Sequence, residues 1–115
     1  MGTVLEAPQL DVVFAALSDP TRRDIVARLS AGEATVKELA EPYAMSMQAV
    51  SQHIRVLERS GLISQGRERQ TRPCRLEPAA LESVQSWIQE SRRTWTERMD
   101  RLETHLALVQ EREKR

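Results

Sequence analysis

The chain has 115 residues, of which 40% are hydrophobic and only 3% aromatic, so it has room for one small domain with an aliphatic, helix-rich core. Its formal net charge is zero, and its single cysteine excludes an intramolecular disulfide and fits a reducing cytosol. No apolar run approaches the roughly 18 residues of a membrane span, and nothing resembles a signal peptide. We therefore expect a cytoplasmic protein without a membrane partner.

Three short helices are predicted after a loose leader at residues 1–8. Apolar residues at helical spacing predict the first helix: Leu10, Val13, Phe14 and Leu17. Asp19 and Pro20 start the second helix as its N-cap and its first helical residue, and Ile25, Val26 and Leu29 form its inner face. Thr35 and Glu38 form a capping box, which starts the third helix.

The stretch 46–62 predicts a fourth helix, with Ser46 as its N-cap and Gly61 just past its end. Its apolar residues recur every three or four positions and line one side: Met47, Val50, Ile54 and Leu57. Its other side holds amides, a hydroxyl and arginines: Gln48, Ser51, Gln52, Arg55 and Arg59. Such groups pair with base edges or phosphates in a DNA major groove. An ordinary amphipathic surface helix is the alternative interpretation.

The period then changes to two, which predicts a β-hairpin with strands over 62–65 and 71–76. Pro73 has no N–H to donate, so the returning strand must lie at an edge or be irregular there. Two antiparallel strands with arginines at their tip, directly after a groove-reading helix, are typical of a DNA-binding wing. The alternative is a solvated hairpin without a partner.

Positive charge is concentrated in this central part of the chain. Residues 46–75 hold six arginines against two glutamates, a net charge of +4, whereas residues 1–45 sum to −3 and residues 76–115 to −1. A local basic block on a neutral protein predicts binding to a polyanion.

Pro78 starts a last helix. No proline or glycine interrupts residues 79–115, so this helix can run to the end of that stretch. Its apolar residues keep a three-to-four rhythm: Leu81, Val84, Ile88, Trp95, Met99, Leu102, Leu106 and Val109. The preceding domain is too small to cover so long an apolar seam, which therefore predicts pairing with a second copy of the chain, joined by the first helix. Whether this helix bends near Ser91 stays open.

Four segments occur in the order expected for a known family: Phe14–Arg23, Glu38–Tyr43, Ala49–Leu57 and Gly61–Ile63. Together they resemble the arsenic-repressor (ArsR/SmtB-type) winged helix-turn-helix regulators, and Arg72–Glu77 is similar to a branch that lacks the usual metal sites. The resemblance implies a mainly α fold with a small β-hairpin, dimerising through the first and the long C-terminal helices. The winged core would span 9–78 (helix-turn-helix 35–60, wing 62–77) and the dimerisation helix 79–115.

The resemblance also implies a homodimer that binds double-stranded DNA and acts as a repressor at an imperfect palindromic operator. The expected DNA-binding residues are Ser46, Gln48, Ser51, Gln52, Arg55, Arg67, Arg69 and Arg72. The expected dimer-interface residues are Leu10, Val13, Phe14, Leu17, Val84, Ile88, Trp95, Met99, Leu102 and Leu106. His53 lies between the two faces of its helix and is expected to pack or bond to backbone, and Arg22 and Arg23 to be structural or solvated.

Metal, redox and catalytic roles have weaker support. The third helix lacks the family's thiol ligands, and Glu103-Thr-His105 supplies only half of its other site, so we expect no metal and no cofactor. Cys74, near Arg72 and Arg75, is either a redox switch with a lowered pKa or a buried strand residue. A winged-helix protein-interaction module without DNA affinity is the other rival. We expect no enzyme, and no small-molecule or redox inducer is identifiable.

Overall fold

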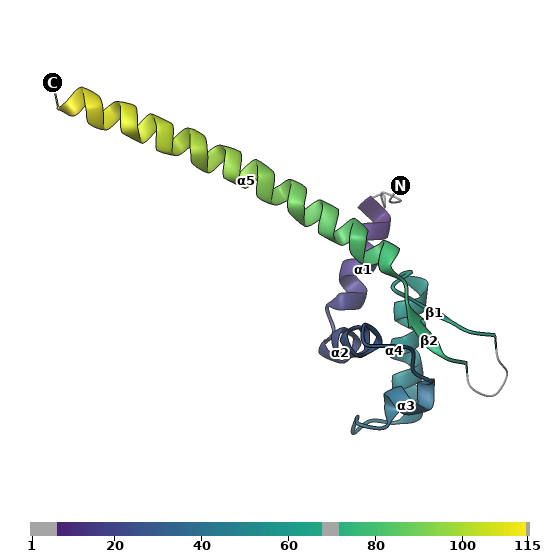
Figure 1. Cartoon of the computed structure of the whole chain (residues 1–115). Coiled ribbons are helices and arrows are strands. Elements are labelled where there is room, and N and C mark those ends of the chain that lie inside the picture. Colours follow the sequence, from purple (N-terminus) through teal and green to yellow (C-terminus); the bar gives the residue numbers. More distant parts are fainter. Residues whose placement is uncertain (1–6, 68–71, 115) are drawn as a thin grey trace. The chain divides into compact units, whose positions relative to one another are not determined.

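The computed structural model describes residues 7–67 and 72–114 (Figure 1). Its elements are α1 (Ala7–Leu17), α2 (Pro20–Leu29), α3 (Val36–Ala40), α4 (Met47–Arg59), β1 (Ile63–Gln65), β2 (Cys74–Leu76) and α5 (Pro78–Glu113). The chain divides into two compact units, one ending at Ser83 and the other beginning at Val84. The predicted fold class, mainly α with a small hairpin, is confirmed.

Two arginines of α2 bind the C-terminal end of α1. Arg22 donates from Nε to the carbonyl of Ala16 at 2.6 Å and from Nη2 to that of Ala15 at 3.1 Å. Arg23 donates from Nη1 to the carbonyl of Leu17 at 2.8 Å. The last carbonyls of a helix have no partner within it, so these guanidinium groups have the structural role expected for them.

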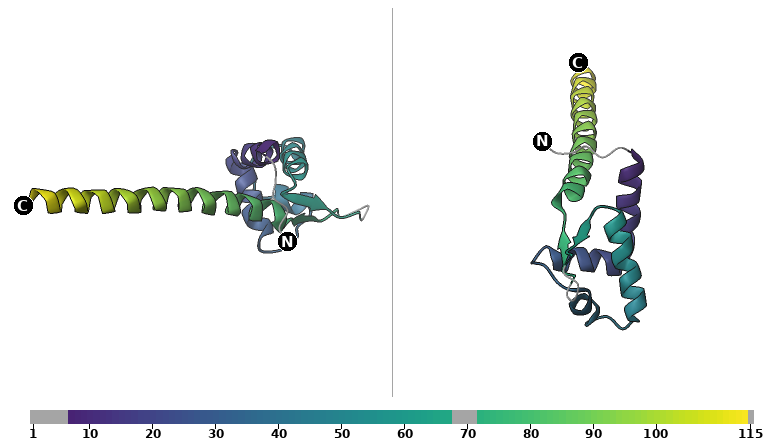
Figure 2. Two further views of the ribbon diagram at one scale, coloured as in Figure 1. Left: turned by 90° about the horizontal axis from the view of Figure 1, so that it is seen from above. Right: turned by 90° about the vertical axis from the view of Figure 1, so that its right-hand side faces the viewer.

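The predicted caps set the starts of α2 and α3. Asp19 accepts the backbone N–H of Arg22 at 3.0 Å, and Pro20 follows as the first helical residue. Thr35 and Glu38 each accept the other's backbone N–H at 3.1 Å, which is the complete capping box. In Figures 1 and 2, α2 runs crosswise to α4, while α3 contacts α4 to complete the helix-turn-helix.

The end of α3 and the Tyr43 ring that follows it contact α2 through one arginine. The guanidinium of Arg28 donates to the carbonyls of Leu39 at 2.8 Å and Glu38 at 3.0 Å. It also lies 5.5 Å from the centre of the Tyr43 ring, whose hydroxyl donates to the carboxylate of Asp24. These contacts set where the turn begins and therefore where α4 starts.

An aliphatic core joins α1, α2, α3, α4 and the hairpin. Its largest members are at most 2% exposed: Val13, Ile25, Leu39, Val50, Ile54, Leu57, Leu62, Ile63 and Cys74. Burying a side chain of this kind contributes about 1.5–3 kcal/mol. Met47, predicted on the same side of α4 as Val50, Ile54 and Leu57, is 50% exposed. It is the first residue of α4 and lies in an open pocket beside α3.

The hairpin is shorter than predicted and gains a third backbone partner. β1 and β2 pair antiparallel, with Ile63 opposite Leu76. On its other side, Cys74 exchanges backbone hydrogen bonds with Ala34, at 2.7 and 3.2 Å. Pro73 precedes β2, so it removes no ladder bond, and its carbonyl accepts the N–H of Gly66 at 2.8 Å.

The helix α5 has 36 residues and continues without interruption through Ser91, which gives a length of about 54 Å at 1.5 Å per residue. Among residues 7–67 and 72–114, no helix is both long and apolar enough to span a membrane.

Candidate nucleic-acid interface

The two faces of α4 differ as the sequence predicts. Val50, Ile54 and Leu57 are at most 1% exposed, whereas Gln48 and Gln52 point away from the core and are exposed. The remaining predicted groups of this helix are the exposed Ser46 and Arg55 and the half-buried Ser51. Ser46 is also the N-cap, because its Oγ accepts the N–H of Ala49 at 3.1 Å. The packed face fixes the helix, so the polar face is held in one orientation.

Two neighbours on this polar face are bonded to each other. The amide oxygen of Gln52 accepts from Nη2 of Arg55 at 2.9 Å and from Nε at 3.3 Å. Because a guanidinium group only donates hydrogen bonds, the Gln52 side chain must turn its oxygen toward Arg55. Its NH2 group is the part left for another partner.

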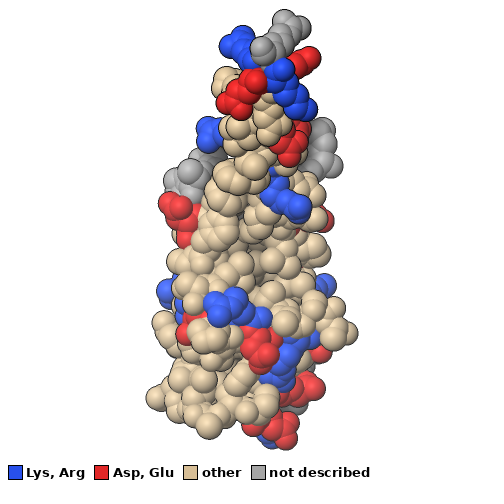
Figure 3. All heavy atoms as spheres, turned by 90° about the vertical axis from the view of Figure 1, so that its left-hand side faces the viewer, with Lys and Arg blue, Asp and Glu red and all other residues tan. Residues whose placement is uncertain are grey.

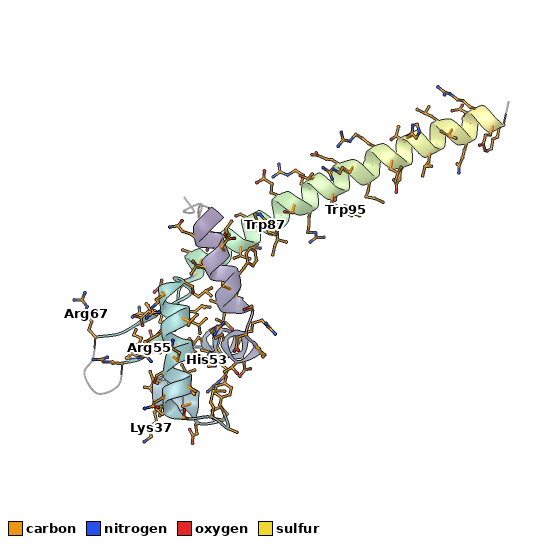
Figure 4. The ribbon with its side chains drawn as sticks, turned by 180° about the vertical axis from the view of Figure 1, so that it is seen from behind. Lys37, His53, Arg55, Arg67, Trp87 and Trp95 are labelled. Carbon is orange, nitrogen blue, oxygen red and sulfur yellow. The ribbon has the colours of Figure 1, made fainter. Side chains whose placement is uncertain are left out.

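A cleft of about 320 Å³ lies between α4 and the hairpin. Ser51 and Arg55 line it from α4, Gln65 lines it from β1, and Arg72 lines it from the hairpin. Figure 4 shows Arg55 on the side of α4 that faces the hairpin, and Arg67 farther out along the hairpin. The structure therefore brings Ser51, Arg55 and Arg72 together, with the carboxylate of Glu58 in the same cleft. Guanidinium groups can bind a phosphate, and the negative charge of Glu58 offsets part of theirs.

The remaining hairpin arginines differ in their surroundings. Arg67 and Arg72 are both exposed, and Arg72 has a φ of +29°, a left-handed conformation that costs a non-glycine residue about 1–2 kcal/mol. Arg75 is 3.5 Å from the carboxylate of Glu33, which offsets part of its charge. Arg69 lies outside the described residues. On the face drawn in Figure 3, basic and acidic side chains are interspersed and no single-sign patch forms.

The comparisons with known proteins agree with this geometry. A family described as a helix-turn-helix domain matches residues 17–65. The transcriptional repressor SdpR of Bacillus subtilis is 34% identical over 76 residues, which are 66% of this chain and 84% of that protein. The HTH-type transcriptional regulator Rv2034 of Mycobacterium tuberculosis is 37% identical over 86 residues, which are 75% of this chain and 78% of that protein.

Solved structures identify the family to which the chain is similar. The crystal structure of the ArsR family transcriptional regulator RHA00566 is similar with a TM-score of 0.76 at 38% identity, over 82% of this chain and 97% of that chain. The chain belongs to the ArsR family of winged helix-turn-helix regulators. An ArsR-like regulator from Rhodococcus sp. RHA1, with a TM-score of 0.72 at 27% identity, covers 83% of this chain and 90% of its own. This family membership makes the chain a DNA-binding transcriptional regulator.

In this ArsR-family chain, His53 points away from the wing. It lies on the side of α4 toward α2 (Figure 4), is 21% exposed, and its Nδ1 is 3.2 Å from Nη1 of Arg22. Since the guanidinium can only donate, the Nδ1 atom accepts. The same nitrogen is 3.9 Å from the carboxylate of Asp19, whose pKa is lowered chiefly by the backbone N–H of Arg22. His53 is thus packed, as expected, with side chains rather than backbone as partners.

Of the two alternatives for Cys74, the structure supports the buried strand residue. Its thiol is fully buried, and its pKa is raised to about 11 by burial and by the charge of Glu58. Arg75 points elsewhere, toward Glu33, and Arg72 is exposed. A neutral, inaccessible thiol is a poor nucleophile, so the structure disfavours the redox alternative and favours the buried strand residue.

The residues expected at the ArsR-type dimer interface differ widely in their exposure. Val13 is 0% exposed, so it belongs to the core of its own chain and has no surface left for a partner. Leu10 and Leu17 are half-buried, and Val84 is 8% exposed. The others are 38–65% exposed: Phe14, Ile88, Trp95, Met99, Leu102 and Leu106. Trp87, not in the expected set, is 51% exposed.

Sequence reasoning missed two polar residues that line the cleft, Glu58 and Gln65. Glu58 lies one turn beyond Ile54 on α4, and Gln65 is the last residue of β1. The alternation of side chains along β1 could have shown that Gln65 lies on the face opposite to Ser64. It could not have shown which of the two faces turns toward α4. Among residues 7–67 and 72–114, no three His, Cys, Asp or Glu side chains are grouped as a metal site would require.

Proposed function

We propose that this chain is a repressor that binds an imperfect palindromic operator as a homodimer, and that it catalyses no reaction. The two-sided α4 carries this proposal. Val50, Ile54 and Leu57 on its apolar face are at most 1% exposed. Its polar face presents the exposed side chains of Gln48, Gln52 and Arg55 beside a wing with further arginines. Amides and guanidinium groups recognise base edges in the major groove, and wing arginines suit phosphates. The repressor named among its relatives supports the direction of regulation.

The homodimer is supported by the exposed apolar residues of α5. Trp95, Met99, Leu102 and Leu106 recur at alternating spacings of four and three, and they are 38–65% exposed. Such a seam is typical of pairing between two helices. A two-fold dimer would carry two copies of α4 into successive major grooves roughly 34 Å apart, which is why we expect an operator with two-fold symmetry.

The test is selection of bound sequences from a random DNA pool with the wild-type protein and Gln52→Ala. The wild type should enrich an inverted repeat. Gln52→Ala should lose preference at one position of each half-site and bind the wild-type operator more weakly by about 1–3 kcal/mol. Binding that is equally tight to all sequences would contradict a specific repressor. Absence of DNA binding would instead favour a protein-interaction module.

A further inference from the structure

The hydrogen bond between Gln52 and Arg55 changes what α4 offers to a base. A free glutamine reads adenine with both halves of its amide: the oxygen accepts from N6 and the NH2 group donates to N7. Here the amide oxygen of Gln52 receives two donors from Arg55, at 2.9 and 3.3 Å. An amide oxygen has two lone pairs, so both are engaged within the helix.

The groups that remain on this pair are donors only. Gln52 keeps its NH2 group, and Arg55 keeps its Nη1 group, for which no partner is seen among the described contacts. Both side chains are exposed, on the polar face of α4. Guanine is the base that presents two adjacent acceptors, O6 and N7, in the major groove, whereas adenine presents one acceptor and one donor.

We propose that Arg55 acts as a specificity-determining residue by engaging the amide oxygen of Gln52, so that the pair selects guanine and rejects adenine. This inference rests on the proposed function, because it requires α4 to enter a major groove. It makes Gln52 a donor to the base and gives Arg55 a second task besides its own contact with DNA.

The test compares four proteins in selection from a random DNA pool: wild type, Gln52→Ala, Arg55→Met and Arg59→Met. Gln52→Ala identifies the position that Gln52 contacts, because preference is lost there. At that position the wild type should select guanine. Arg55→Met keeps the side-chain length but removes the donors, so the freed amide should shift the selection toward adenine, changing the guanine-to-adenine ratio roughly tenfold.

Arg59→Met is the matched control, since it removes an exposed arginine one turn further along the same helix. It should bind more weakly yet still select guanine. Wild-type selection of adenine at the position marked by Gln52→Ala would overturn the inference, as would an Arg55→Met protein that still selects guanine there. A wild type that enriches no sequence contradicts the proposed function itself, which separates the two failures.

A second measurement holds even if Arg55→Met binds too weakly for selection. Replacing the selected guanine by 7-deazaguanine removes the N7 acceptor and leaves the base pair intact. Wild-type binding should fall roughly tenfold, while Gln52→Ala should respond much less. An equal loss in both proteins would mean that Gln52 donates nothing to this base, and the inference would be wrong.

Discussion

The thiol of Cys74 is held in its neutral form by its place in the sheet. Cys74 is fully buried, its backbone pairs with Ala34 on one side and with β1 on the other, and the pKa of its thiol is about 11. At pH 8 the thiolate is therefore only about a thousandth of the population. The cause is desolvation, which penalises the charged form, with a smaller contribution from the negative charge of Glu58.

We predict that Cys74 resists alkylation by iodoacetamide in the native protein and reacts at once when the chain is unfolded in urea. The expected difference in rate at pH 8 is at least about a hundredfold, because both access and thiolate are lost on folding. Mass spectrometry of quenched samples measures it. Rapid native labelling, or DNA binding that changes after peroxide treatment, would restore the redox alternative.

Between elements, the two adjacent arginines of α2 that bind the C-terminal end of α1 offer a matched comparison. Arg22 bonds to two carbonyls of α1 and to His53 of α4, and it is half-buried. Arg23 makes one exposed bond to the next carbonyl, that of Leu17. The two residues are adjacent and carry the same charge, so they differ mainly in the number of hydrogen bonds that each substitution would remove, two of those of Arg22 being partly buried.

We predict that Arg22→Met lowers the free energy of unfolding by about 1–3 kcal/mol, because it leaves acceptors on two helices without donors. Arg23→Met should cost less than about 1 kcal/mol, since water can replace its single exposed bond. Urea denaturation followed by circular dichroism measures both. Equal losses would show that charge, and not the bonds across α1, α2 and α4, explains the effect.

For the whole molecule, the apolar seam of α5 predicts the state of assembly. Leu102 lies on the seam and is 48% exposed. Thr104 is two residues away, on the opposite side of the helix by the helical period, and its hydroxyl donates to the carbonyl of Asp100. A glutamate at either position adds the same charge to the same turn, so only its side of the helix differs.

We predict that Leu102→Glu shifts the protein to monomers in sedimentation velocity at micromolar concentration, while Thr104→Glu leaves it dimeric. Two leucines per dimer would lose burial worth about 3–6 kcal/mol in total. The operator affinity of Leu102→Glu should fall with the dimer. A wild type that sediments as a monomer, or a Thr104→Glu protein that dissociates equally, would contradict the seam as the interface.

Much of the fold could be predicted from local patterns. The caps at Asp19 and Thr35, and the buried face of α4, depend only on residues three or four positions apart. Hydrogen bonds of a first helical turn and one-sided apolar spacing are properties of a short segment. For the same reason the polar face of α4, which is the main part of the candidate site, could be identified before any contact was known.

What the tertiary structure decided is every property that depends on a neighbour distant in the sequence. Val13, expected at the dimer interface, lies in the core of its own chain, and Met47, on the apolar side of α4, is exposed. Burial also decides between the two alternatives for Cys74, because it raises the pKa of the thiol. Burial and local dielectric are set by whatever packs on a side chain, and spacing along one helix does not contain that information. The sequence by itself determined which residues face outward on α4, whereas only side-chain geometry decided which atoms of Gln52 remain available to a base.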